Sequence, residues 1–180
     1  MNFKQTIELL LQVLNKNPEK YALIGGFALG FSQVHRTTSD IDFLVDIDAV
    51  EPFTEFLTGL GYKKAFESED VIQFSSALSP LASIDILIAH RPQAYTILSR
   101  ARDEAAFGKP IRVALTEDLI GLKLQALSNP MRENLYDHAD IKALIKANRA
   151  SLDFTLVEPY FDLFQQQELW AHLKIEFKID

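Results

Sequence analysis

Three aspartates interrupt apolar, strand-forming runs of the chain. Asp40 and Asp42 open the run 40–45, and Asp85 lies inside the run 83–88. On a strand, residues i and i+2 point to the same side and lie roughly 6–7 Å apart, so Asp40 and Asp42 can serve one group of cations. An ionised carboxylate in apolar surroundings costs several kcal/mol unless a partner or a metal compensates it. The pattern therefore predicts a site for two Mg²⁺ ions, which bind carboxylate oxygens together with oxygens of a substrate phosphate.

Two consecutive glycines precede these aspartates. Gly25 and Gly26 follow the short apolar run 21–24 and begin a stretch with helical spacing over 27–34. Glycine allows backbone N–H groups to approach a ligand closely, and the start of a helix favours negative charge. The pair is a candidate for binding the phosphates of a nucleoside triphosphate. A plain strand-to-helix turn is the alternative interpretation.

The spacing of apolar residues predicts the elements that must position these groups. Strands are expected at 21–24, 40–45, 62–66, 71–75, 82–89 and 111–114, with a turn at Ser79-Pro80. Helices are expected at 3–14, 27–34, 48–61, 94–101, 116–127, 133–148 and 155–173, with a break at Asn129-Pro130. The prediction is an α+β fold in which a small mixed β-sheet is flanked by helices. We expect a core over residues 1–115 and a C-terminal helical portion over 116–180 packed on it.

Capping signals place two helix starts. Asp48, with Glu51 three residues later, has the pattern of a capping box, and Thr116 is expected to cap the helix that follows it. Asp46 and Asp48 are therefore predicted to be turn and cap residues rather than metal ligands.

Composition limits the class of protein. The 180 residues are 48% hydrophobic and 24% charged, which is typical of one globular domain, alone or with a helical appendage. The absence of cysteine excludes disulfides and thiolate metal sites. The start of the chain is too polar for a signal peptide, and the apolar runs are too short to span a membrane. We expect a cytoplasmic protein without a membrane partner.

Charge is distributed unevenly along the chain. The net charge of −7 argues against a surface that binds nucleic acid throughout, because phosphate binding depends on Lys and Arg. Residues 91–149 nevertheless hold 10 basic and 7 acidic side chains. A polyphosphate could lie between the aspartates and this segment. Solvated helix charges are the alternative for these residues taken singly.

The ordered set of motifs resembles a known family. The chain resembles the nucleotidyltransferase superfamily, which includes DNA polymerase β. The likeness rests on Gly25-Gly26, a short helix, the motif Arg36-x-Thr38-x-Asp40-Ile41-Asp42 and a later isolated aspartate on a strand. Within it, the chain looks most like the AbiEii-type nucleotidyltransferases, several of which are toxins of toxin–antitoxin systems. The likeness covers most of the chain, because 116–127 and the stretch from Arg132 to Ile141 resemble the C-terminal helices of that family.

The resemblance implies a role for each motif residue. Asp40 and Asp42 would hold both metals, and Asp85 would complete the catalytic one and is a candidate for taking the proton from the attacking hydroxyl. The alternative for Asp85 is a strand-end residue bonded to the backbone. Many relatives carry serine at the position of Gly26, and Thr38 or Ser39 are candidates to replace that hydroxyl.

Two basic residues complete the predicted nucleotide site. In similar proteins a lysine at the position of Lys123 reaches the triphosphate, although a solvated helix lysine is the alternative. Arg36 is expected to fix the loop before Asp40, because a guanidinium beside carboxylates favours their ionised form. Asp137 and Asp140 share one helical face and could anchor a basic side chain or line the cleft.

These motifs together predict a magnesium-dependent nucleotidyltransferase that moves a nucleoside monophosphate from an NTP to an acceptor hydroxyl. The acceptor could be the 3′ end of tRNA or another RNA, a protein side chain, or a small molecule, and the basic segment favours RNA. The protein could be a toxin with a cognate antitoxin. The alternative is a catalytically silent module of a toxin–antitoxin pair that binds a nucleotide or a partner.

Overall fold

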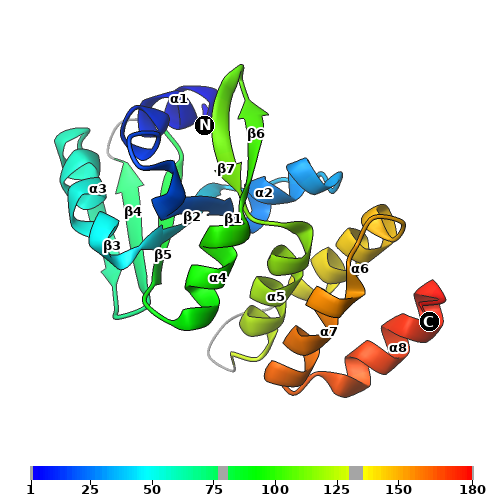
Figure 1. The fold of residues 1–180 in the computed structure, drawn as a ribbon. Coiled ribbons are helices and arrows are strands. Elements are labelled where there is room, and N and C mark those ends of the chain that lie inside the picture. Colours follow the sequence, from blue (N-terminus) through cyan, green and yellow to red (C-terminus); the bar gives the residue numbers. More distant parts are fainter. Residues whose placement is uncertain (1, 77–80, 130–135, 180) are drawn as a thin grey trace. The chain divides into compact units, whose positions relative to one another are not determined.

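The computed structural model describes residues 2–76, 81–129 and 136–179 (Figure 1). The predicted turn at Ser79-Pro80, the break at Pro130 and the family residue Arg132 lie outside these ranges. The chain divides into two compact units. Unit 1 comprises residues 1–28 and 37–114, and unit 2 comprises residues 29–36 and 115–180. The short stretch 29–36 groups with the C-terminal helices, and no pattern in the sequence indicates this.

A seven-stranded sheet forms the centre of unit 1, with the strand order β3-β4-β5-β2-β1-β7-β6. The central strand β2 runs parallel to β5 and antiparallel to β1, so the sheet is mixed. The predicted α+β fold with a small mixed sheet flanked by helices is therefore confirmed. The strands are β1 (Tyr21–Ile24), β2 (Asp40–Asp46), β3 (Tyr62–Glu67), β4 (Val71–Ser76), β5 (Ser83–Ala89), β6 (Arg102–Ala106) and β7 (Lys109–Val113).

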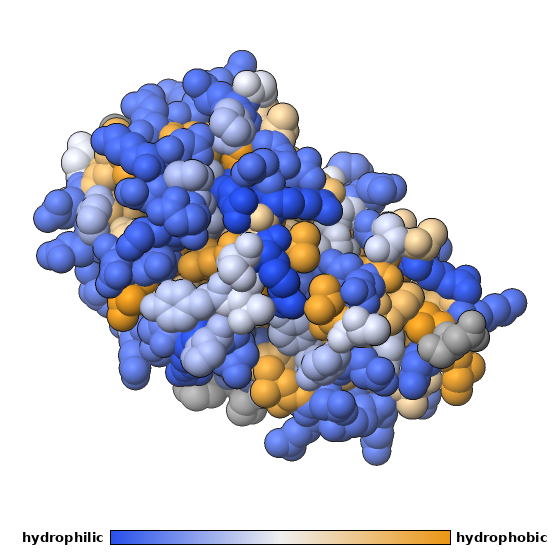
Figure 2. Space-filling model, viewed as in Figure 1, coloured by the Kyte–Doolittle hydropathy of each residue, from blue (hydrophilic) through white to orange (hydrophobic). Residues whose placement is uncertain are grey.

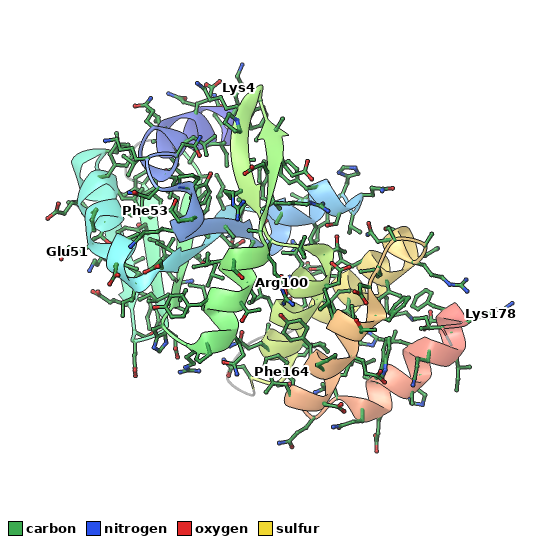
Figure 3. The ribbon with its side chains drawn as sticks, viewed as in Figure 1. Lys4, Glu51, Phe53, Arg100, Phe164 and Lys178 are labelled. Carbon is green, nitrogen blue, oxygen red and sulfur yellow. The ribbon has the colours of Figure 1, made fainter. Side chains whose placement is uncertain are left out.

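Three longer helices, α1 (Phe3–Leu14), α3 (Ile47–Gly59) and α4 (Pro92–Arg100), flank this sheet. α4 packs against β1 and β2. On α3, Phe53 points toward the sheet and Glu51 points away from it (Figure 3). The Phe53 ring meets Phe43 of β2 edge to face, with 6.1 Å between ring centroids, and both side chains are buried. Burying an aromatic side chain of this size contributes about 1.5–3 kcal/mol, which fixes one face of β2 against the core.

The predicted cap of α3 at Asp48 is wrong, because Asp46 caps the helix. The Asp46 carboxylate accepts a hydrogen bond from the Asp48 backbone N–H at 2.9 Å, while Asp46 itself keeps a non-helical backbone with φ −53° and ψ 135°. Asp48 lies in the first turn instead, where its negative charge is favourable and pairs with Lys20 at 3.6 Å. β2 therefore passes directly into the helix.

The strand β6 is not predicted by the sequence, because Arg-Asp-Glu at its start reads as a polar loop. It pairs with β7 in a hairpin whose turn is Phe107-Gly108. Both turn residues have positive φ, 52° and 78°, as the tight turns of two-residue hairpins require. This hairpin extends the sheet beyond β1, on the side away from β5.

Unit 2 is helical, with α5 (Thr116–Leu127), α6 (Asp137–Asn148), α7 (Phe154–Leu163) and α8 (Gln167–Phe177). α5 packs against α6 and α7. The Tyr160 ring lies directly over Gly121, where an added Cβ would come within 2.7 Å of ring atoms, and the Tyr160 hydroxyl donates to Asp118 at 2.6 Å. Gly121 therefore permits the close packing of α7 on α5.

Three other helix predictions need correction. Thr116 does not cap α5, because its hydroxyl bonds the Ser32 hydroxyl at 2.8 Å and Leu115 occupies the cap position. The single helix predicted for 155–173 is two helices, separated where Gln165 takes a positive φ of 55°. The helix predicted for 27–34 begins at the two glycines, as expected, but only α2 (Gly25–Ala28) is an α-helix, and it continues as a tighter 3-10 turn over Leu29–Ser32.

The face drawn in Figure 2 shows hydrophilic residues over most of unit 1, with hydrophobic residues scattered among them. Exposed single hydrophobic residues of this kind are common on protein surfaces. Among the described helices, none combines the length and the apolar character needed to cross a membrane.

Candidate active site

The structure brings Asp40, Asp42 and Asp85 together on one face of unit 1. β2 and β5 pair in parallel register, with Asp42 opposite Asp85 and Asp40 opposite Ser83. One carboxylate oxygen from each aspartate lies within 4.8 Å of the others, and all three residues are half-buried. We call these three residues the carboxylate cluster. The alternation of strand side chains places them on one face, because 40, 42 and 85 all occupy equivalent positions in the pleat.

Gly25 lies against the carboxylate cluster. It takes a positive φ of 67° directly after β1, and a Cβ added there would overlap the Asp42 carboxylate. An L-amino acid at this position would therefore be strained twice, by its backbone and by the collision. Gly26 follows as the second, buried residue of α2. The two glycines differ in their structural role, since Gly25 makes room for the side chain of Asp42.

Two neutral polar side chains hold members of the cluster. Thr38 donates its hydroxyl hydrogen to Asp40 Oδ1 at 2.6 Å, so this hydroxyl contacts a carboxylate, and Ser39 beside it is exposed. Gln73 of β4 donates from Nε2 to Asp85 Oδ2 at 2.9 Å. Gln73 is absent from the residues predicted by the sequence. The only sequence feature that indicates Gln73 is its position in β4 between the buried Ile72 and Phe74, since its amide then lies on the other face of the strand from these two side chains.

The donor set of the cluster fits a hard divalent cation. Its ligating atoms are carboxylate oxygens alone, which suit magnesium better than softer metals. Carboxylates this close repel one another, and a bound cation relieves that repulsion. The cluster can therefore hold divalent metal, and through it the phosphates of a nucleotide.

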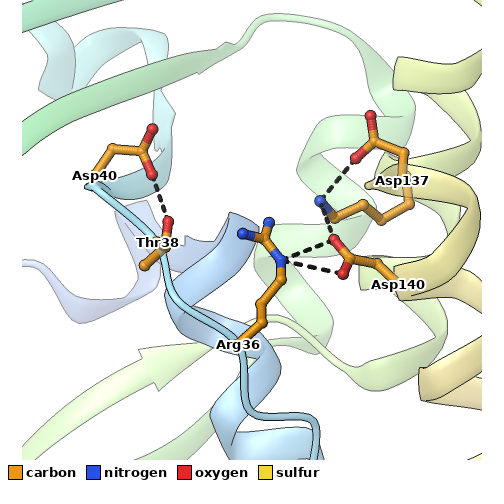
Figure 4. A network of polar contacts seen from close by, with 6 residues as sticks. Arg36, Thr38, Asp40, Asp137 and Asp140 are labelled. Carbon is orange, nitrogen blue, oxygen red and sulfur yellow. Dashed lines mark hydrogen bonds and ion pairs between the residues drawn. The ribbon is translucent and has the colours of Figure 1, made fainter. Parts of the chain in front are cut away.

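A second cluster of charged residues lies in unit 2 (Figure 4). Lys123 of α5 contacts Asp137 Oδ1 and Asp140 Oδ2 of α6, each at 2.8 Å. Arg36 donates from Nε to both oxygens of Asp140 at 3.1 and 3.2 Å. The side chains of Asp140, Asp137 and Lys123 are only 5%, 9% and 12% exposed, and that of Arg36 is 27% exposed. We call these four residues the charge network.

The charge network matches one of the two interpretations of Asp137 and Asp140, because both aspartates anchor basic side chains. Its two positive and two negative charges balance, as buried charges generally require. Tyr136 adds a contact, since the Arg36 guanidinium lies 5.7 Å from the centroid of its ring. Arg36 and Lys123 are therefore held in unit 2 by Asp140, which they share.

The basic segment 91–149 contains several ion pairs with acidic partners. These pairs are Arg91–Asp70, Arg102–Glu104, Arg112–Asp103, Lys123–Asp137 and Lys142–Glu176. Much of the excess positive charge of this segment is thus offset locally, which favours the interpretation as ordinary surface and network charges.

Comparisons with known proteins find the fold in several nucleotidyltransferases. The antibiotic-resistance factor ANT(2'')-Ia is similar over 98% of this chain and 97% of its own, with 17% identity and a TM-score of 0.63. The lincosamide antibiotic adenylyltransferase LnuA, solved with lincomycin, is similar over 80% of this chain and 97% of its own, with 15% identity and a TM-score of 0.58. An antigenic nucleotidyltransferase-like protein from Paracoccidioides brasiliensis shares 18% identity over 95% of this chain and 91% of its own, with a TM-score of 0.56.

No protein-family model and no curated protein sequence matches the chain. The similarity is therefore one of structure, and it identifies the fold as that of nucleotidyltransferases.

Proposed function

We propose that the protein is a magnesium-dependent nucleotidyltransferase that moves a nucleoside monophosphate from an NTP to an acceptor hydroxyl. One observation carries the proposal: three carboxylates on adjacent strands lie within 4.8 Å of one another on a nucleotidyltransferase fold. Carboxylates in this arrangement suit two Mg²⁺ ions. When bound, the two cations supply positive charge that offsets the charge developing on the triphosphate.

The reaction forms a bond between the acceptor oxygen and the α-phosphorus and breaks the bond from that phosphorus to the bridging oxygen. Pyrophosphate leaves in line with the attack. In this proposal Asp40 and Asp42 would hold both cations. Asp85 would complete the catalytic cation site and would accept the proton of the attacking hydroxyl. Thr38 keeps the Asp40 carboxylate in place through its 2.6 Å hydrogen bond.

Nucleotide binding is assigned to backbone and basic groups. The backbone N–H groups around Gly25 and Gly26 are candidates for phosphate oxygens, with Thr38 and Ser39 as neighbouring hydroxyls. Arg36 and Lys123 are also proposed to bind the triphosphate. Because both bind Asp140, any contact with a nucleotide must compete with that carboxylate.

For the acceptor, a small molecule is the first candidate. ANT(2'')-Ia was solved with adenylyl-2''-tobramycin and LnuA with lincomycin, and both are similar to this chain. Unit 1 holds 14 acidic and 10 basic residues, and unit 2 holds 11 and 8, so neither unit has the positive charge typical of RNA binding. An RNA 3′ end and a protein hydroxyl remain the other candidates, and the toxin role with a cognate antitoxin rests on the AbiEii-type likeness alone.

A silent binding module of a toxin–antitoxin pair is the second candidate function. The observation that favours it is the engagement of Arg36 and Lys123 by acidic residues, which leaves the triphosphate fewer charged contacts. The complete carboxylate cluster weighs against it, because a module that only binds a partner has no need of three adjacent carboxylates.

Incubation with Mg²⁺ and each α-labelled NTP tests the proposal. Total RNA, the protein itself and a panel of hydroxylated small molecules serve as acceptors in separate reactions. We expect label to appear on one acceptor class and to fall by orders of magnitude in Asp85→Asn, with NTP affinity kept within several-fold. Asp103→Asn, an exposed strand residue of the same unit, is the matched control. NTP binding without label on any acceptor would favour the silent module.

A further inference from the structure

Gln73 lies in the same row of the sheet as two members of the carboxylate cluster. β4 pairs antiparallel with β5 so that Gln73 is opposite Asp85, and Asp85 is in turn opposite Asp42. The three side chains therefore project from one face on three adjacent strands. Gln73 is half-buried there, and its Nε2 lies 2.9 Å from Asp85 Oδ2.

The chemistry of the pair fixes the orientation of the amide. An ionised carboxylate only accepts hydrogen bonds, so the Gln73 nitrogen and not its oxygen must face Asp85. The amide is a donor without charge. A lysine or arginine at this position would neutralise Asp85 and compete with a cation for it, whereas glutamine restricts the carboxylate and keeps its charge available.

We propose that Gln73 is a positioning residue for the metal site, which sets the rotamer of Asp85 so that its carboxylate is aligned with Asp40 and Asp42 before a cation binds. This inference rests on the proposed function only in taking the cluster to be a metal site. A carboxylate has two oxygens with about four lone-pair positions, so a bond to Gln73 at Oδ2 is compatible with cation binding by the same group. Hydrogen-bond partners of ligating side chains typically change metal affinity or activity by 10- to 100-fold when they are removed.

The test compares Gln73→Met with wild type. Methionine keeps the length and volume of the side chain but donates no hydrogen bond. We expect Mn²⁺ affinity, measured without nucleotide by electron paramagnetic resonance, to fall by about 10- to 100-fold. In a transfer assay, kcat should fall more than KM for the NTP rises. The melting temperature of the metal-free protein should stay close to that of wild type.

Gln93→Met is the matched control. Gln93 is exposed in the first turn of α4, so the same substitution is made in the same unit at a position that is not in the sheet.

The readouts separate this inference from the proposed function. Mn²⁺ affinity that depends on Gln73 supports the positioning role even in a protein that transfers no nucleotide. Equal Mn²⁺ affinity in wild type and Gln73→Met overturns it, even in an active enzyme. A loss of melting temperature without a change in Mn²⁺ affinity also overturns it, because Gln73 would then be a structural residue only.

Discussion

The molecule contains two clusters of acidic residues that differ in the charge of the groups bound to them. In the carboxylate cluster, Asp40 accepts a hydrogen bond from a hydroxyl and Asp85 from an amide, both of which are neutral. In the charge network, Asp137 and Asp140 contact an ammonium and a guanidinium. Neutral donors orient a carboxylate but leave its charge in place, whereas paired cations offset it. The first cluster is suited to bind an external cation, and the second is suited to hold helices together.

The largest expected effect comes from removing charge at the carboxylate cluster. Asp42→Asn should lower magnesium-dependent transfer by about a thousandfold or more, because the shared cations lose a ligand charge. Without metal, the melting temperature should stay equal or rise, since repulsion among the carboxylates is relieved. Differential scanning fluorimetry with and without Mg²⁺, beside the transfer assay, measures both. A clear loss of melting temperature in the metal-free protein would mean that Asp42 stabilises the fold, as Asp137 and Asp140 are proposed to do.

The next effect tests the charge network. Asp140→Asn removes the carboxylate that Arg36 and Lys123 share, so two largely buried cations lose a partner. Breaking a buried ion pair in this way costs about 3–5 kcal/mol. Chemical denaturation should show that loss, with Asp162→Asn on the surface of α7 as the control. Asp137→Asn should cost less, because Lys123 keeps Asp140. Stability equal to that of the control would mean that the network is not structural.

The smallest effect tests the proposed contact of Lys123 with the triphosphate. Lys123→Ala should weaken binding of a non-hydrolysable NTP by about 1.5–3 kcal/mol, the usual contribution of one charge-assisted hydrogen bond. Titration calorimetry on folded protein measures it. Lys142→Ala, which removes the exposed pair with Glu176 from the same unit, is the matched control. Unchanged NTP affinity in Lys123→Ala would restrict the charge network to a structural role.

Local sequence patterns predicted much of the fold. The helix 3–14 and the strand 21–24 have the same bounds in the structure. Apolar residues at helical spacing define the helix, and a continuous apolar run before two glycines defines the strand. The errors lie where tertiary contacts override a local signal. Thr116 has the residue type of a cap, yet its hydroxyl bonds Ser32, which is 84 residues away. The strand β6 is polar in sequence and exists because β7 pairs with it.

The candidate site also contains features that the sequence predicts and features that depend on tertiary contacts. Strand alternation predicts that Asp40 and Asp42 share one face, whereas the family resemblance predicts the approach of Asp85, which depends on the pairing of β2 with β5. The partners of these residues were not predicted, since Gln73 is a single amide in an ordinary strand and its bond to Asp85 depends on the register of β4 with β5. The mutual pairing of Arg36, Asp140 and Lys123 likewise depends on how stretch 29–36 packs with the C-terminal helices, which local spacing does not encode.

The parallel pairing of β2 with β5 also has a consequence for folding. Asp42 and Asp85 are 43 residues apart and become neighbours only when this long-range pairing is complete. A slip of one residue would turn Asp85 to the opposite face of the sheet, because strand side chains alternate. Non-local pairings of this kind form slowly compared with helices. If the cluster binds cations as proposed, we expect cation binding during refolding to appear only when the central strands have reached their native register.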